Sequence, residues 1–151
     1  ELLRAGLNVR EQPEALMVLK RLDHAAVVTP SGYLIHVDSE ARRGRAQITA
    51  DKLTAAVTHR GAVVASGQAC VAGDTMIADR ILTDPAHRRK GLARAVMNAL
   101  TEYSYRQGAR QGVLVASATG QRLYSALGWD YHLRLVVGQG AGPEKAAAPG
   151  V

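Results

Sequence analysis

The sequence predicts an α/β domain with a mixed, mostly antiparallel central sheet flanked by helices. Three strand-like segments follow one another at residues 53–58, 62–71 and 76–83, and the connections between them are too short to hold a crossover helix. After them come a helix, a short apolar strand, a second helix and a final strand. A run of antiparallel strands that passes into alternating helices and strands indicates a mixed sheet.

Turn residues divide the three consecutive segments. Gly61 lies between the first and the second, and Gly73 lies between the second and the third. Pro85 follows the third segment and ends it, because proline has no N–H to donate to a neighbouring strand. We therefore expect an antiparallel meander over residues 53–83.

A helix is predicted soon after Pro85. Apolar residues recur there at intervals of three and four, which places them on one face of a helix. These residues are Leu92, Val96, Ala99, Leu100 and Tyr103. The helix should end before Gly108, because glycine commonly follows the last turn of a helix.

Three further elements complete the second half of the chain. The short apolar run at residues 113–116 predicts a strand that is buried on both faces. Residues 119–127 predict a second helix, which Gly128 closes. Residues 129–137 contain alternating polar and apolar side chains and predict a final strand.

The front of the chain predicts different elements. Residues 12–22 carry apolar side chains at roughly helical spacing, so we expect a short helix there. The apolar segments 25–28 and 33–37 flank a turn that contains Pro and Gly, which predicts a hairpin. Polarity rises over residues 39–51, where we expect a loop.

Length and composition fit one globular domain. With 151 residues, 47% hydrophobic and 21% charged, we expect a single domain at residues 1–137, with a variable front half at residues 1–52. Residues 138–151 are rich in Gly, Ala and Pro and predict a flexible tail. No apolar run approaches the roughly 18 residues of a membrane span, and the lone Cys70 cannot form an internal disulfide. We therefore expect a cytoplasmic protein with no membrane partner and no metal.

The chain is basic and should attract anions. It has 19 Lys and Arg against 13 Asp and Glu, a net charge of +6 and a pI of about 9.9. Charge alone does not distinguish phosphates, nucleic acid and lipid. Because Phe is absent and aromatic residues make up 4% of the chain, surfaces for base stacking are scarce and we expect no nucleic-acid partner. The basic cluster at Arg42, Arg43 and Arg45 lies in a polar stretch and predicts a solvated loop.

A second basic cluster lies in the segment at residues 83–93, which joins a strand to the start of a helix. Unpaired backbone N–H groups and the helix dipole favour an anion at such a point. Arg88, Arg89 and Lys90 add positive charge there, although a helix without a ligand prefers acids in its first turn. Gly91 lets the backbone approach a ligand closely. An anion site and a solvated basic turn are both consistent with these residues.

The same loop resembles the coenzyme A loop of the GNAT acetyltransferases. That loop has the pattern Gln/Arg-x-x-Gly-x-Gly/Ala, which Arg88, Gly91 and Ala93 fill at the right spacing. The family ends the preceding strand with an apolar residue or Thr, any residue and then Pro, as residues 83–85 do.

A second motif lies downstream of this loop. Residues 123–129 read Leu-Tyr-Ser-Ala-Leu-Gly-Trp and are similar to the family's Leu-Tyr-x-x-Leu-Gly-Phe segment. One helix and one strand separate the two motifs, as in the family. The resemblance covers about residues 53–137 and implies a GNAT-like fold.

The resemblance implies an N-acetyltransferase, which moves an acetyl or other short acyl group from acyl-coenzyme A to an amine by direct attack. Acetyl-CoA is the implied co-substrate, and the acceptor is a small-molecule or peptide amine. Tyr124 is implied as the general acid that protonates the departing thiolate. Asp79 is a candidate general base, although Arg80 beside it suits an ion pair instead. His87 and His132 are weaker candidates.

The resemblance also implies a set of cofactor-binding residues. The end of one strand would hold the pantetheine through its backbone, and the basic loop would hold the pyrophosphate through its N–H groups. The residues are Ile81, Leu82, Thr83, Arg88, Arg89, Lys90, Gly91, Leu92, Ala93, Ser117 and Gly120. Ser117 and Gly120 stand where the family commonly has Asn and Ala.

The front half departs from the family pattern. The family usually places one strand and two helices there, which shape the acceptor site, whereas residues 12–37 predict one helix and two strands. The final strand also lacks an obvious hairpin partner. Either another part of the chain supplies that partner, or a second subunit supplies it in a homodimer, or the interpretation of the front half is wrong. Two other functions stay open: a non-catalytic acyl-CoA-binding regulatory domain and a basic nucleic-acid-binding module.

Overall fold

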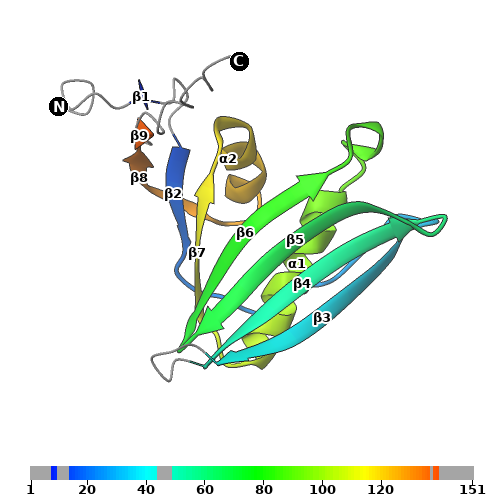
Figure 1. Cartoon of the computed structure of the whole chain (residues 1–151), viewed down its shortest axis with the longest axis horizontal. Coiled ribbons are helices and arrows are strands. Elements are labelled where there is room, and N and C mark those ends of the chain that lie inside the picture. Colours follow the sequence, from blue (N-terminus) through cyan, green and yellow to red (C-terminus); the bar gives the residue numbers. More distant parts are fainter. Residues whose placement is uncertain (1–7, 10–13, 44–48, 137, 140–151) are drawn as a thin grey trace, which may run out of the picture.

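The computed structural model describes residues 8–9, 14–43, 49–136 and 138–139. Within these residues, a seven-stranded sheet has the order β3-β4-β5-β6-β7-β2-β8, and the helices α1 (Leu92–Arg106) and α2 (Ala118–Ser125) pack against it (Figure 1). The strands are β2 (Glu14–Leu19), β3 (Leu34–Arg43), β4 (Thr49–His59), β5 (Ala62–Ala72), β6 (Thr75–Thr83), β7 (Gln111–Ala116) and β8 (Asp130–Leu135). Among the described strands of this sheet, only β6 and β7 pair in parallel, which confirms the mixed, mostly antiparallel fold.

The strands β3 to β6 form an antiparallel meander that α1 covers on one face. The strands β4, β5 and β6 confirm the three predicted segments, and α1 confirms the first predicted helix. Leu53 and Val57 of β4 are buried and belong to the same core as Val96 and Leu100 of α1. Burial of such side chains contributes about 1.5–3 kcal/mol each. The meander and α1 therefore share one hydrophobic core.

The predicted helix at residues 12–22 is wrong, because residues 14–19 form the strand β2. This strand lies inside the sheet and pairs with β7 on one side and β8 on the other. Ala15 and Met17 are buried and alternate with half-buried neighbours, which is the two-residue period of a strand. Apolar residues at nearly every position satisfy both periods, so the pairing with distant strands decides the structure.

The strand β2 also answers the question of the missing sheet partner. The predicted final strand forms β8 at the sheet edge, and β2 lies between β8 and β7. The partner therefore comes from the same chain, about a hundred residues earlier. The argument for a homodimer from an unpaired strand no longer applies.

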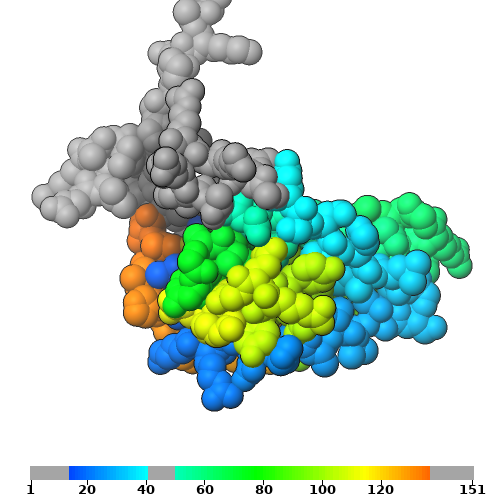
Figure 2. Space-filling view, turned by 90° about the horizontal axis from the view of Figure 1, so that it is seen from below, coloured from blue at the N-terminus to red at the C-terminus, as the bar shows by residue number. Residues whose placement is uncertain are grey.

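The predicted hairpin at residues 25–28 and 33–37 is wrong in its first arm. Residues 25–28 form no strand and instead cross α1, where the Ala25 N–H donates to Glu102 Oε2 at 3.2 Å. The Asn98 Nδ2 donates to the Ala26 carbonyl oxygen at 2.7 Å. Figure 2 shows this blue segment beside the yellow-green end of α1. Side chains of α1 therefore satisfy the backbone groups that a strand partner would have satisfied.

The predicted loop at residues 39–51 is wrong at both of its ends. Residues 39–43 continue β3, and β4 starts at Thr49, while residues 44–48, with Arg45, lie outside the described part. The strand β3 forms the edge of the sheet, so Asp38 and Glu40 are exposed without disturbing the core. Polar side chains therefore do not end a strand at this position.

The predicted helix and strands in the second half of the chain are present with small changes. The second helix is α2, and the apolar run at residues 113–116 belongs to β7, but Val115 is 51% exposed. The short strands β1 (Asn8–Val9) and β9 (Gly138–Gln139) pair with each other, and residues 140–151 of the predicted tail lie outside the described residues. Neither of the two described α-helices is long and apolar enough to cross a membrane.

Candidate active site

A cleft opens where β6 and β7 separate. The two strands pair in parallel only over residues 75–78 and 111–114, and beyond these residues they diverge (Figure 1). The cleft between them has a volume of ≈ 1000 Å³, which is at the upper end for a small-molecule site. Its lining comes from β6, the loop after β6, the first turn of α1, β7 and α2, with Glu14 from β2.

A β-bulge in β6 lies at the mouth of this cleft. Arg80 and Ile81 both oppose Gly67 of β5, and Arg80 has a positive φ of 54°. A Cβ on Gly67 would lie 2.5 Å from Ile81 Cδ1 and 2.6 Å from Val96 Cγ1, so only glycine leaves room for the Ile81 side chain there. The bulge therefore turns Arg80 outward, seats Ile81 under β5 and bends β6 away from β7.

The loop after β6 is held at its start by Asp84. The Asp84 N–H donates to the Val64 carbonyl oxygen at 2.9 Å, and Asp84 Oδ1 accepts from the Ala86 N–H at 2.8 Å. The second bond caps the short 3-10 helix η1 (Pro85–His87). The Arg88 Nε also donates to the Thr83 carbonyl oxygen at 3.3 Å. These bonds tie the loop to the end of β6 before the basic residues begin.

The first turn of α1 presents backbone N–H groups to the cleft. Gly91 is the N-cap with φ 78° and no side-chain cap, and the first turn has no acidic residue. Four of the predicted cofactor-binding residues line the cleft here: Arg89, Gly91, Leu92 and Ala93. A Cβ on Gly91 would meet nothing within 4 Å, so space for a ligand lies directly beside the backbone.

Positive side chains surround this helix end. Arg88, Arg89 and Arg94 line the cleft, and Arg89 has a positive φ of 60°, which is uncommon for a residue other than glycine. Uncapped N–H groups, a helix dipole and three guanidinium groups together suit a phosphate-bearing ligand.

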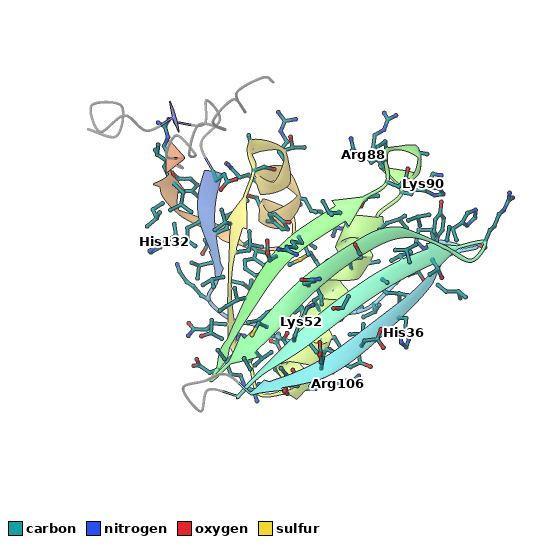
Figure 3. The ribbon with its side chains drawn as sticks, in the orientation of Figure 1. His36, Lys52, Arg88, Lys90, Arg106 and His132 are labelled. Atoms are coloured by element: carbon teal, nitrogen blue, oxygen red, sulfur yellow. The ribbon has the colours of Figure 1, made fainter. Side chains whose placement is uncertain are left out.

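Lys90 does not belong to the described lining of the cleft. Its Nζ donates to the Tyr33 hydroxyl oxygen at 3.2 Å, behind the loop. Figure 3 shows Arg88 and Lys90 on the turn between β6 and α1. His132 lies far from them, on the edge strand β8. His87 also contacts Tyr33, through a 2.9 Å hydrogen bond to Nδ1. The geometry therefore separates Lys90 from the other predicted cofactor-binding residues.

The end of β6 forms one wall of the cleft. Ile81, Leu82 and Thr83 line it, and the pairing with β7 has already ended there, so this edge of β6 can hydrogen-bond a ligand. The Thr83 Oγ1 is buried and has no hydrogen-bond partner within the described structure. A buried hydroxyl without a partner at the wall of a cleft fits a polar ligand group.

Tyr124 of α2 lies on the opposite wall. The residue is 8% exposed, and its ring packs 6.3 Å from the Trp129 ring, centroid to centroid. Burial, and to a smaller extent the negative charge of Asp79, raise the pKa of the Tyr124 phenol above its ordinary value. The phenol therefore stays protonated at neutral pH and can donate a proton.

The start of α2 shapes the space beside Tyr124. Ser117 is the N-cap, and its Oγ accepts from the Gly120 N–H at 3.2 Å. A Cβ on Gly120 would lie 3.0 Å from Tyr124 Cε2, so the glycine lets the ring lie close to the helix backbone. Both Ser117 and Gly120 line the cleft, and both have a structural role that the sequence did not indicate.

The comparison with family models decides the family. The acetyltransferase (GNAT) domain model matches residues 50–131. The chain belongs to the GNAT acetyltransferase family.

Solved structures agree with this assignment. A GCN5-related N-acetyltransferase from Kribbella flavida has a TM-score of 0.68 at 18% identity, over 93% of this chain and 63% of that one. A tandem GNAT protein from the clavulanic acid biosynthesis pathway has a TM-score of 0.70 at 13% identity, over 93% and 57%. A GCN5-related N-acetyltransferase from Sphaerobacter thermophilus has a TM-score of 0.67 at 15% identity, over 97% and 57%.

At identities of 13–18% these three structures show the fold, and this chain spans 57–63% of their length. No curated protein matches the sequence.

Two residues of this GNAT protein that the sequence did not predict as site residues also line the cleft. Glu14 lines the cleft from β2, and Arg94 lines it from α1. Glu14 lies outside both motifs, and the apolar run that follows it at residues 15–19 fits a helix and a strand alike. Arg94 comes directly after the loop motif that ends at Ala93, and no position of the motif marks it.

The Asp79 carboxylate lies at the bulge and has partners from the next residue. It accepts from the Arg80 N–H at 2.7 Å, and its Oδ2 lies 3.5 Å from Arg80 Nε. Both side chains are mostly exposed, so this ion pair is weak. The pairing that the sequence suggested is therefore present, and Asp79 also lines the cleft. Within the described residues, no group of His, Cys, Asp or Glu could hold a metal ion.

Proposed function

We propose that this GNAT protein transfers an acetyl or other short acyl group from acyl-CoA to an amine in the cleft between β6 and β7. One observation carries the proposal: a single cleft has a basic, uncapped helix N-terminus at one wall and the buried phenol of Tyr124 at the other. Neither feature alone indicates acyl transfer, but a GNAT fold with both supports a phosphate-bearing co-substrate beside a proton donor.

The residues present fit acetyl-CoA. The N–H groups from Arg89 to Ala93 would hold the pyrophosphate, with Arg88 and Arg94 screening its charge. The backbone of residues 81–83 would hydrogen-bond the pantetheine along the unpaired edge of β6. The Thr83 hydroxyl, which is buried without a partner, would gain one from the ligand. The free space beside Gly91 allows the phosphates to contact the backbone.

The co-substrate supplies an activated thioester, and the protein supplies position and a proton. Holding the amine and the thioester in attack geometry contributes up to roughly 7–11 kcal/mol. Tyr124 donates its proton to the departing thiolate. The reference pKa values are about 10 for Tyr and about 8.5 for a thiol, and the raised pKa of Tyr124 makes this transfer more uphill while keeping the phenol protonated.

The acceptor end of the cleft carries carboxylates. Asp79 lies on the β6 side, and Glu14 lies on the β2 side. Carboxylates near an amine attract its protonated form and can accept a proton from it. We propose Asp79 as the general base and Glu14 as an acceptor-facing carboxylate.

A binding-only function is the second candidate, and the Asp79–Arg80 ion pair favours it. If Arg80 keeps Asp79 occupied, the cleft binds acyl-CoA without activating an amine. Release of free thiol from acetyl-CoA across a panel of small amines and lysine peptides separates the two functions. Turnover supports the transferase, and binding without turnover supports the regulatory domain.

A thermal shift tests the site itself. Acetyl-CoA at a hundredfold excess over its Kd should stabilise the fold by about 2.7 kcal/mol and raise Tm. Absence of any shift, together with salt-sensitive binding to DNA or RNA, would overturn the proposal in favour of a nucleic-acid-binding module.

A further inference from the structure

Four side chains meet behind the loop that follows β6, outside the cleft lining. Tyr33 comes from the turn before β3, His59 from the end of β4, and His87 and Lys90 from the loop itself. The Tyr33 hydroxyl lies 2.9 Å from His87 Nδ1 and 3.2 Å from Lys90 Nζ. The Tyr33 and His59 rings stack at 4.6 Å between centroids, with an interplanar angle of 28°. We call these four residues the Tyr33 cluster.

Two hydrogen bonds meet at the Tyr33 hydroxyl. The Lys90 ammonium can only donate, so the Tyr33 oxygen accepts from it. The second bond joins the same hydroxyl to His87 Nδ1, and its direction follows the tautomer of the His87 ring. Among the described residues, Tyr33 therefore connects both ends of the basic stretch at residues 87–90.

The Tyr33 ring is itself held in place. His59 stacks on it, and His59 Nδ1 lies 2.8 Å from the Gly32 carbonyl oxygen, in the same turn as Tyr33. The Tyr33 N–H also donates to the Pro30 carbonyl oxygen at 3.1 Å. The cluster thus anchors the loop to the turn before β3 and to the end of β4, which both belong to the meander.

The residues between His87 and Lys90 need such an anchor. Arg89 has φ 60°, a backbone conformation that residues other than glycine keep only when the surroundings hold them in it. Arg88 and Arg89 line the cleft on the other side of the loop. The Tyr33 cluster therefore holds the two residues that bracket this strained turn.

We infer that Tyr33 is a positioning residue, which holds the loop at residues 87–91 in the shape that binds the phosphates of acetyl-CoA. This inference rests on the proposed function. A loop that already has its binding shape loses less conformational entropy when a ligand binds, so the cluster should increase affinity without touching the ligand. The effect should appear in binding and not in the chemical step.

The test is Tyr33→Phe, which removes both hydrogen bonds and keeps the ring that stacks on His59. Calorimetry with acetyl-CoA should show Kd raised by about tenfold, the size expected for losing a hydrogen bond to a charged group, while kcat at saturation changes less than about twofold. Tyr131→Phe on the exposed strand β8 is the matched control and should change neither value.

A double-mutant cycle shows whether Tyr33 acts through His87. His87→Ala removes one of the two bonds and should raise Kd by less than Tyr33→Phe, and Tyr33→Phe/His87→Ala should be little worse than Tyr33→Phe alone, because Tyr33→Phe already removes the bond to His87. His87→Gln, which keeps a polar side chain that can pair with the Tyr33 hydroxyl, should restore much of the affinity. A general loosening of the fold would give additive effects and no rescue.

Each outcome decides the question. Wild-type protein that does not bind acetyl-CoA overturns the proposed function and this inference with it. Wild-type protein that binds, with Tyr33→Phe binding equally well or losing kcat instead, overturns the inference alone. If Tyr33→Phe does not fold, Lys90→Met removes one bond from an exposed side chain, and an unchanged Kd in that variant overturns the inference.

Discussion

The two walls of the cleft are built in different ways. The β6 wall presents the backbone edge of β6, the uncapped start of α1 and exposed guanidinium groups. Neighbouring strands of the meander support this wall. The α2 wall presents a buried phenol packed on Trp129, and the long-range strand β2 supports it. The walls meet only along residues 75–78 and 111–114. The proposed function assigns cofactor binding to the first wall and proton transfer to the second, so variants should be able to damage one and spare the other.

The largest expected effect is on the α2 wall. Tyr124→Phe should lower kcat by about 10²–10⁴-fold, the usual contribution of a general acid, because the thiolate loses its proton donor. The Kd for acetyl-CoA should stay nearly unchanged, because the phosphates bind the other wall. Steady-state kinetics and calorimetry measure the two quantities, with Tyr103→Phe on α1 as a control. An unchanged rate would remove Tyr124 from the mechanism.

The next effect is on the β6 wall. Gly91→Val places a branched side chain at φ 78° and in the space that the phosphates would occupy, so the Kd for acetyl-CoA should rise by about 100-fold or more. Gly108→Val is the matched control, because Gly108 has φ 100° and equal space, but it lies at the other end of α1. Both variants should lose similar stability. Only Gly91→Val should lose binding, and equal binding by the two would contradict the loop assignment.

A third prediction concerns the stability of the fold on each side of the cleft between β6 and β7. Gly112→Ala would place a Cβ 2.7 Å from Trp129 Cη2, beneath the α2 wall, and should lower the free energy of unfolding by about 1–3 kcal/mol. Gly67→Ala in the meander should cost a similar amount, because its Cβ would meet Ile81 and Val96. Chemical denaturation measures both. Gly67→Ala should also weaken acetyl-CoA binding, since Ile81 belongs to the cofactor wall, whereas Gly112→Ala should not.

The smallest expected effect is electrostatic, because the charge of Asp79 on the β6 wall acts on Tyr124 on the α2 wall. The negative charge of Asp79 contributes to the raised pKa of Tyr124, although burial contributes more. Asp79→Asn removes that charge, so the pKa of Tyr124 should fall part of the way toward its ordinary value of about 10. The alkaline limb of the kcat profile, where the phenol ionises, should therefore move to lower pH.

The plateau value of kcat in the same pH profile of Asp79→Asn gives a second result. A large drop in the plateau supports Asp79 as the general base, and a small one supports the ion pair with Arg80. An alkaline limb that stays in place would mean that Asp79 does not influence Tyr124. Asp130→Asn on β8 is the control for a general loss of negative charge.

The sequence predicted the β6 wall better than the α2 wall, for a physical reason. Strands β4, β5 and β6 pair with their neighbours in the chain, so turn residues and local periods indicate them. The helices α1 and α2 carry clear apolar faces. The strand β2 pairs with strands about a hundred residues away, and its run of apolar residues fits a helix and a strand equally well. Only the pairing distinguishes the two.

Among the residues of the candidate site, those in local motifs could also be predicted, and those placed by distant contacts could not. The basic loop and Tyr124 follow from two local motifs, and both line one cleft. Glu14 could not be predicted, because its place depends on β2. Lys90 could not be assigned either, because the direction of its side chain depends on Tyr33, which comes from a turn outside the motif. Spacing shows which residues share a loop, and tertiary contacts decide which of them face the ligand.

The central claim is that the split between β6 and β7 is the acetyl-CoA site. Amide hydrogen exchange with and without acetyl-CoA tests it most directly, because the claim assigns the ligand to backbone N–H groups. Protection should increase at residues 81–83 and 89–93, with little change along β3. Protection at other segments, or none at saturating acetyl-CoA, would contradict the claim.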